Sequence, residues 1–255
     1  MDLESKVALV TGGASGIGRG IALTLAKNGY DVAITYFGSS EGAENVVREI
    51  REMGRRAEGY KADLGKYSEI CRVFEEIKRD FKTLEVFVNN AGLTEKSAFL
   101  DTTEETFDKI CNLDFKGAYF CTQKAATIMR DNGTHGSIII ISSNNAFAHF
   151  ADVSVYGSVK AAVGKFAEHA AIELAKYDIR VNTIAPGWTD TGAARLDDKE
   201  STFYKIPLRK WADVSEIADA VVYLSSDSAR SITGITVVID NGALLLSDKR
   251  ERYGF

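Results

Sequence analysis

The stretch VALVTGGASGIG, residues 7–18, decides the fold class of this chain. Its four leading apolar residues are typical of a buried strand, and apolar residues continue at helical spacing beyond the glycine-rich turn. Glycines between a strand and a helix let the backbone approach a pyrophosphate, which free N–H groups of the helix N-terminus stabilise. The spacing of Gly12, Gly16 and Gly18 is not that of G-x-G-x-x-G, and such a turn can also be a plain tight turn. The stretch therefore predicts a strand–turn–helix unit that favours a dinucleotide.

Short β-branched runs alternate with helical patterns along the whole chain. Buried strands are predicted at 7–10, 32–36, 86–89, 137–141, 180–184 and 235–239, and a weaker one at 57–62. Apolar residues three or four apart mark helices between them: Ile17, Ile21 and Leu25; Ile70, Phe74 and Ile77; Val163, Phe166, Ala170 and Leu174. Such units favour a parallel sheet with helices on both faces, because each crossover covers one face. We predict one doubly wound α/β domain of Rossmann type over residues 1–255, with residues 188–207 as an irregular loop or short helices.

Composition narrows the choice of partners. The 255 residues include 31 Lys and Arg and 36 Asp and Glu, a net charge of −5, with 45% hydrophobic residues, as in soluble globular proteins. No Lys/Arg run exceeds two residues, so neither nucleic acid nor an anionic membrane is favoured. The longest aliphatic run, 138–141, is far shorter than a membrane-spanning helix, and the acidic N-terminus is unlike a signal peptide. Three cysteines without a C-x-x-C pair predict no disulfide framework and no metal site, and we expect a cytoplasmic protein.

Tyr156 and Lys160 stand four residues apart at the start of a predicted helix. Such positions share a helix face, so the hydroxyl and the ammonium can point into one pocket. A phenol has a pKa of about 10, and a neighbouring cation lowers it towards neutral pH. Ser143 follows the strand at 137–141, at the end where parallel sheets bind ligands. Alone these signals are weak, since Y-x-x-x-K is usually a solvated pair and Ser143 can be a helix cap or part of a turn.

Taken in order, these segments resemble the short-chain dehydrogenase/reductase family. The resemblance rests on T-G-x-x-x-G-x-G at residues 11–18, N-N-A-G at 89–92, and Ser143, Tyr156 and Lys160 at matching spacings. It extends to D-L at 63–64, P-G at 186–187, T-G at 233–234 and D-N-G at 240–242, and so covers nearly the whole chain. Within the family, the resemblance leans towards the broad group that contains 3-oxoacyl-carrier-protein reductases and glucose dehydrogenases.

The resemblance implies an NAD(P)-dependent oxidoreductase that acts on carbonyl or alcohol groups. Tyr156 would protonate the carbonyl oxygen as hydride arrives from the nicotinamide, and would act as base in reverse. Lys160 would favour the ionised phenol and hold the nicotinamide ribose, and Ser143 would hydrogen-bond the substrate oxygen. Asp63 can also be a helix cap and Asn90 a turn former. The resemblance places further cofactor contacts at Gly12, Ser15, Gly16, Ile17, Gly18, Asp63, Leu64, Asn90, Ala91, Gly92, Pro186, Gly187, Thr189 and Thr191.

One position departs from the family pattern. The family usually places an asparagine three residues before the glycine of N-x-x-G, where it completes a proton relay. Here Asp114 precedes Gly117 at that spacing, and Asn112, two residues earlier, does not share its helix face. A carboxylate would keep an acceptor oxygen and add negative charge near Lys160. The alternative is a helix distortion that turns Asp114 outward.

The end of the second strand bears on cofactor choice. NAD-using relatives carry an acid there that binds the ribose 2′-hydroxyl and repels a 2′-phosphate. This chain has Tyr36, with Ser39 and Ser40 close behind, and neutral hydroxyls can bind a phosphate. The basic residue that many NADP users place at Ser15 or Phe37 is absent. We therefore favour NADP over NAD.

The main hypothesis is an enzyme with a small-molecule carbonyl or alcohol substrate, whose pocket Phe147, His149, Phe150, Trp188 and Phe203 are candidates to line. A non-catalytic, dinucleotide-binding redox sensor is the rival hypothesis. The resemblance also implies a homotetramer that pairs the helices after the fourth and fifth strands. Apolar residues available for that seam, each of which can equally face the core, are Ala125, Met129, Phe166 and Ala170.

Overall fold

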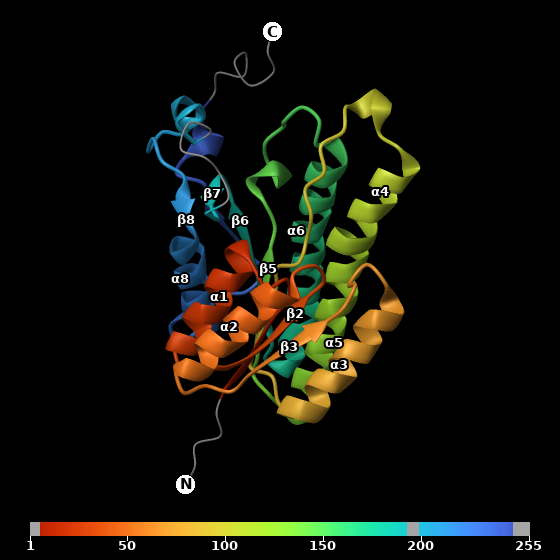
Figure 1. The fold of residues 1–255 in the computed structure, drawn as a ribbon, viewed down its shortest axis with the longest axis vertical. Coiled ribbons are helices and arrows are strands. Elements are labelled where there is room, and N and C mark those ends of the chain that lie inside the picture. The colour runs from red at the N-terminus through yellow and green to blue at the C-terminus, as the bar shows by residue number, and fades with distance from the viewer. Residues whose placement is uncertain (1–5, 193–198, 247–255) are drawn as a thin grey trace.

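Seven parallel strands form the central sheet of the computed structural model, which describes residues 6–192 and 199–246 (Figure 1). The strands are β1 (Val7–Val10), β2 (Asp31–Tyr36), β3 (Ala57–Lys61), β4 (Val86–Asn89), β5 (Ser137–Ile141), β6 (Arg180–Pro186) and β9 (Thr236–Ile239). Their order in the sheet is β3-β2-β1-β4-β5-β6-β9. The chain thus leaves β1 towards β3 and returns to β4 on the other side of β1. The loops after β1 and β4 consequently diverge and leave a crevice at the carboxyl edge of the sheet.

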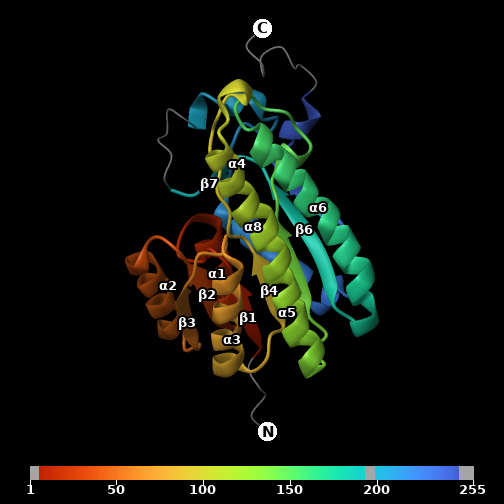
Figure 2. The same ribbon diagram turned by 90° about the vertical axis from the view of Figure 1, so that its right-hand side faces the viewer.

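Helices cover both faces of the sheet (Figures 1 and 2). One layer holds α1 (Gly16–Lys27), α2 (Ser40–Glu52) and α8 (Val214–Ser225), and the other holds α3 (Tyr67–Phe81), α5 (Ala118–Asn132) and α6 (Ser154–Leu174). Successive strand residues point into opposite layers: Val7 and Leu9 belong to the core beside α3, α5 and α6, whereas Ala8 and Val10 belong to the core beside α1, α2 and α8. This is the predicted doubly wound α/β fold, and it explains why the strands are apolar on both faces.

The predicted strands match the observed ones to within two residues at each end. The irregular stretch at 188–207 contains the two-residue strand β7 (Thr189–Asp190) and the 3₁₀ turn η5 (Phe203–Lys205), and its residues 193–198 lie outside the described part of the chain. β7 pairs in parallel with β8 (Ala212–Asp213), a pairing that the sequence did not predict because two residues show no periodicity. Within the described residues, no helix is both long and apolar enough to cross a membrane.

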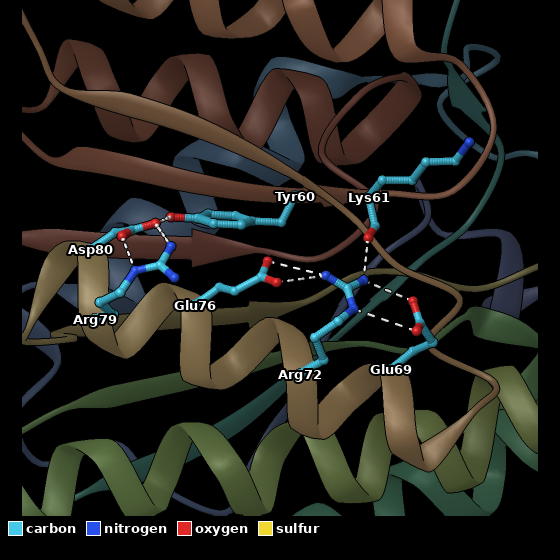
Figure 3. A network of polar contacts seen from close by, with 7 residues as sticks. All are labelled: Tyr60, Lys61, Glu69, Arg72, Glu76, Arg79 and Asp80. Carbon is cyan, nitrogen blue, oxygen red and sulfur yellow. Dashed lines mark hydrogen bonds and ion pairs between the residues drawn. The ribbon is translucent and has the colours of Figure 1, made fainter.

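Polar contacts hold α3 against the edge strand β3 (Figure 3). The Tyr60 hydroxyl donates to Asp80 at 2.8 Å, and burial together with that carboxylate raises the pKa of Tyr60. Arg72 donates to the carbonyl oxygen of Lys61 at 2.7 Å and pairs with two glutamates of α3. The end of β3, from which the chain runs into the crevice, is therefore fixed by a guanidinium on the neighbouring helix.

The long helix that follows β4 contains a π-helical segment in its middle. The helix α4 (Glu104–Ile110) continues without a break into the π-helix η2 (Cys111–Gly117) and then into α5. At the end of η2 the helix approaches the loop after β3 so closely that a Cβ on Gly117 would lie 2.5 Å from the carbonyl oxygen of Leu64. Glycine at this position is what lets the helix and the loop meet.

We expect Gly117→Ala to lower the free energy of unfolding by about 1–3 kcal/mol, because the added methyl overlaps a backbone oxygen that cannot rotate away. Gly38→Ala is the matched control, since a Cβ there meets nothing within 4 Å. Its expected effect is neutral or stabilising by less than about 1 kcal/mol. Urea unfolding followed by circular dichroism measures both variants. Equal unfolding midpoints for the two variants would contradict the assignment of this contact.

Candidate functional site

Two adjoining cavities occupy the crevice at the carboxyl edge of the sheet. The larger, of about 780 Å³, lies between the glycine-rich turn, the end of β2 and the loops after β3 and β4. The smaller, of about 260 Å³, lies over the ends of β5 and β6. The two share Ile17, Asn90, Gly92, Leu93 and Thr191 in their linings, so they form one elongated site.

The backbone of the glycine-rich turn shapes the larger cavity. Gly12 and Gly16 have φ of +66° and +53°, a left-handed conformation that side chains other than glycine rarely adopt. A Cβ on Gly18 would lie 2.3 Å from the carbonyl oxygen of Gly12, so the turn also needs glycine at that position. Ser15, which precedes α1, makes no side-chain cap, and the first turn of α1 carries no acidic residue. The free N–H groups and the positive end of the helix dipole therefore suit an anionic pyrophosphate.

Hydrogen bonds join the loops on the two sides of the crevice. The Thr11 hydroxyl accepts from the backbone N–H groups of Asn90 and Ala91 at 2.9 and 3.0 Å, and the Asn90 amide donates to the carbonyl oxygen of Thr11 at 2.9 Å. Asn89 is buried beneath them and donates to the carbonyl oxygen of Ala118 on α5 at 2.7 Å. The floor of the cavity is thus held in place before any ligand binds. The larger cavity, with its glycine-rich turn and its fixed floor, fits a dinucleotide.

The smaller cavity brings the predicted catalytic residues together. Ser143, Tyr156, Lys160 and Asp114 all line it. Lys160 lies one helical turn after Tyr156 on α6, and its ammonium is 5.5 Å from the centre of the tyrosine ring. The same ammonium donates to the carbonyl oxygen of Ile141 at the end of β5 at 3.3 Å. The helix spacing and the end of the strand together give Tyr156 a cationic neighbour.

Asp114 and Lys160 form a buried ion pair. The distance from Lys160 Nζ to Asp114 Oδ2 is 3.0 Å, and the two side chains are 7% and 0% exposed. Asp114 Oδ1 accepts from the backbone N–H of Leu93 at 2.9 Å. Asp114 lies in the π-helix η2, so a helix distortion is present, but it turns the carboxylate inward; the outward alternative is wrong. The carboxylate therefore contacts the lysine directly.

Ser143 stands where β5 ends and begins the 3₁₀ turn η3 (Asn144–Ala146). Beside it lies a third cavity of about 470 Å³, which Tyr156 also lines. Phe150 and Trp188 form an apolar wall of this cavity, with their rings edge to face at a centroid distance of 5.7 Å. Of the other pocket candidates, Phe147 and His149 are exposed, and Phe203 lies in η5. A substrate in this cavity would reach both hydroxyl groups.

The segment after β6 is held over the crevice by Asp190. Its carboxylate pairs with Lys199 and accepts from the backbone N–H of Gly192 at 2.9 Å. The Lys199 ammonium, more than the Gly192 N–H, holds the pKa of Asp190 below its usual value. These contacts position Thr189 and Thr191, which flank Asp190 and line the site.

Nearly all of the predicted cofactor residues line the crevice. The larger cavity includes Gly12, Ser15, Ile17, Gly18, Tyr36, Asp63, Leu64, Asn90, Ala91, Gly92 and Thr191. Pro186, Gly187 and Thr189 line the smaller one, and Gly16 shapes the turn beside them. Ser39 and Ser40 are placed differently. Both are exposed at the start of α2, where the Ser39 hydroxyl accepts from the backbone N–H of Gly42 at 2.9 Å.

The sequence did not single out several residues that line the crevice. Lys66 and Lys109 bring two ammonium groups to the larger cavity, and no local motif marks either of them. They pair with Asp63 and Glu95 at 3.2 and 2.6 Å. Asn145 lines the third cavity two residues after Ser143. Its polarity next to a candidate catalytic serine is the one signal that could have identified it.

Comparison with known proteins agrees with this geometry. Residues 12–243 match the family model described as enoyl-(acyl carrier protein) reductase. The chain is 37% identical over 244 residues to the uncharacterized oxidoreductase YohF of Escherichia coli, which covers 94% of this chain and 96% of that protein. It is 38% identical over 241 residues to 3-oxoacyl-[acyl-carrier-protein] reductase FabG of Staphylococcus aureus, 93% and 98% of the two chains. The crystal structure of acetoin dehydrogenase YohF from Salmonella typhimurium superposes with a TM-score of 0.90 at 34% identity, covering 96% of this chain and 98% of that chain.

Proposed function

This chain belongs to the short-chain dehydrogenase/reductase family and is an NAD(P)-dependent oxidoreductase acting on a carbonyl or alcohol group, and we propose that Tyr156 is its general acid and base. The observation that carries this proposal is the convergence of Tyr156, Lys160 and Ser143 in one small cavity that opens into the dinucleotide crevice. No observation favours the non-catalytic redox sensor.

The proposed roles follow from the chemistry of each side chain. A nicotinamide bound in the crevice would supply or accept the hydride. In reduction, the Tyr156 hydroxyl gives its proton to the substrate oxygen, and in oxidation the phenolate takes that proton back. The Lys160 ammonium, 5.5 Å from the ring centre, favours the phenolate electrostatically. The Ser143 hydroxyl donates to the substrate oxygen where negative charge develops.

We propose that Asp114 weakens the electrostatic effect of Lys160 on Tyr156. Its carboxylate is 3.0 Å from the Lys160 ammonium and is buried with it, so the pair presents less positive potential to Tyr156 than a lone lysine would. It also fixes the ammonium in one position. Oxidation, which needs the phenolate, should then require a higher pH than with a neutral asparagine at this position.

We propose NADP as the preferred cofactor and a small molecule as the substrate. The carboxyl end of β2 presents Tyr36 to the larger cavity in place of an acid, and its ring lies over Gly59 of β3, whose Cβ would be 3.6 Å away. The two lysines of the cavity, Lys66 and Lys109, are each paired with a carboxylate, so the proposal rests on Tyr36 and not on a cationic group. Since Ser39 caps α2, we assign the phosphate contact to Tyr36 rather than to the serines.

We further propose that one domain carries both cofactor and catalysis, that the protein works in the cytoplasm, and that it assembles as a homotetramer. The support for assembly is a groove of about 400 Å³ between α5 and α6, lined by Tyr119, Phe166, Ala170 and Leu174 among others. Ala125 and Met129, the other two candidates for the seam, are fully buried in the core and do not contribute. A groove lined by apolar residues together with polar and charged ones such as Arg130 and Glu173 suits a two-fold contact between copies.

Catalysis by Tyr156 is tested through the pH dependence of kcat/KM for alcohol oxidation. We expect Tyr156→Phe to be nearly inactive and Asp114→Asn to remain active. The rising limb of the Asp114→Asn profile should move to lower pH, because loss of the carboxylate exposes Tyr156 to the full charge of Lys160. An unshifted profile would mean that Asp114 is electrostatically silent, and an active Tyr156→Phe enzyme would overturn the mechanism.

Cofactor preference is tested by the ratio of kcat/KM for NADP and NAD. The wild type should prefer NADP. Tyr36→Asp should move the ratio towards NAD by about 10-fold or more, because a carboxylate repels the 2′-phosphate and accepts from a 2′-hydroxyl. A wild type several-fold better with NAD would refute the assignment.

Assembly is tested by sedimentation equilibrium at micromolar protein. The expected mass is about four times that of the 27.8 kDa chain. Phe166→Glu, which places a charge in the α5–α6 groove, should reduce the mass, whereas Phe37→Glu at an exposed site outside the groove should not. A wild-type mass equal to one chain would rule out the tetramer.

A further inference from the structure

The Ser143 hydroxyl accepts two hydrogen bonds from one neighbouring residue. Ser143 Oγ accepts from the backbone N–H of Asn145 at 3.2 Å and from the side-chain amide of the same residue, also at 3.2 Å. A hydroxyl oxygen has two acceptor positions and one hydrogen. Both acceptor positions are therefore taken by Asn145, and Ser143 Oγ donates no hydrogen bond within residues 6–192 and 199–246. Its hydrogen remains for a group in the cavity.

The fold holds Asn145 firmly in this position. It lies in the 3₁₀ turn η3, which closes with a hydrogen bond from the Ala146 N–H to the carbonyl oxygen of Ser143 at 3.0 Å. The first turn of α6 packs against it, and a Cβ on Gly157 would lie 3.2 Å from the carbonyl oxygen of Asn145. Asn145 and Tyr156 line the same cavity. The amide thus reaches the serine from a turn wedged between β5 and α6.

We propose that Asn145 is a positioning residue that makes Ser143 a hydrogen-bond donor only, aimed at the substrate oxygen that Tyr156 protonates. This inference rests on the proposed function. A free serine hydroxyl can rotate and either donate or accept. The substrate oxygen gains negative charge as the hydride is transferred, so only a donor stabilises the transition state. Filling both acceptor positions with N–H groups removes the unproductive rotamers in advance.

The substitution Asn145→Asp separates polarity from shape. Aspartate has nearly the same size, but its carboxylate accepts where the amide donates. The Ser143 hydroxyl would then donate to the new carboxylate and turn a lone pair towards the substrate oxygen. We expect kcat to fall by roughly 10²-fold, the usual cost of losing one oxyanion donor, with KM changed little. Asn145→Ala removes one donor without adding an acceptor and should cost only a few-fold.

The order of the two variants is the first test. If Asn145 served only to pack the turn, the alanine variant, which loses more contact, would be the more damaged. An alanine variant less active than the aspartate variant would therefore overturn the proposal. Far-UV circular dichroism and the fluorescence change on cofactor binding show whether both variants keep the fold and the dinucleotide site.

A double-mutant cycle with Ser143→Ala is the second test. If Asn145 acts through the serine, Asn145→Asp should change kcat by less than about 3-fold in the Ser143→Ala background. A full 10²-fold loss in that background would show that the new charge acts directly on Tyr156 or the cofactor, and would refute the inference. A fully active Ser143→Ala enzyme would overturn the proposed role of the serine, whereas an impaired Ser143→Ala enzyme with an unaffected Asn145→Asp enzyme would overturn only the inference about Asn145.

Discussion

The buried ion pair between Asp114 and Lys160 is the contact on which the geometry of the site depends. It joins the π-helix η2 to α6 and, through the lysine, to the carbonyl oxygen of Ile141 at the end of β5. Two opposite charges in a region of low dielectric hold each other tightly, and removing one partner leaves an uncompensated charge. The pair therefore links α6 to η2 and to the end of β5. Tyr156 lies one turn away on the same helix, so its position follows from that of Lys160.

Space for this ion pair is provided by two glycines, Gly92 on the loop after β4 and Gly117 at the end of η2. A Cβ on Gly92 would lie 2.7 Å from Asp114 Oδ2, and one on Gly117 would lie 2.5 Å from the carbonyl oxygen of Leu64. Any larger residue at either position would push the loop away from the helix. The π-helix has a wider turn than an α-helix and so turns the carboxylate towards the lysine. Helix geometry and small residues thus act together to bring a charged group into the core.

Backbone groups shape one part of the crevice, and side chains line the other. Glycines with positive φ, the uncapped start of α1 and the hydrogen bonds between Thr11 and the loop after β4 shape the part that suits a pyrophosphate. Charged and hydroxyl side chains define the smaller cavity, to which we assign hydride transfer as a proposal. The third cavity, the proposed place of the substrate, is lined in part by segments outside the sheet, η3 and the stretch after β6. Substrate choice can therefore change without disturbing the dinucleotide cradle.

The sequence by itself determined the seven strands to within two residues, their parallel arrangement, and Ser143, Tyr156 and Lys160 as the candidate catalytic set. These features depend on local periodicity and on the order of motifs along the chain. The inward orientation of Asp114 and the two hydrogen bonds from Asn145 to Ser143 were decided only by the tertiary structure. A π-helical turn has no local sequence signature. The direction of a side chain at the end of a strand depends on which helix packs against it, here α6 at Gly157.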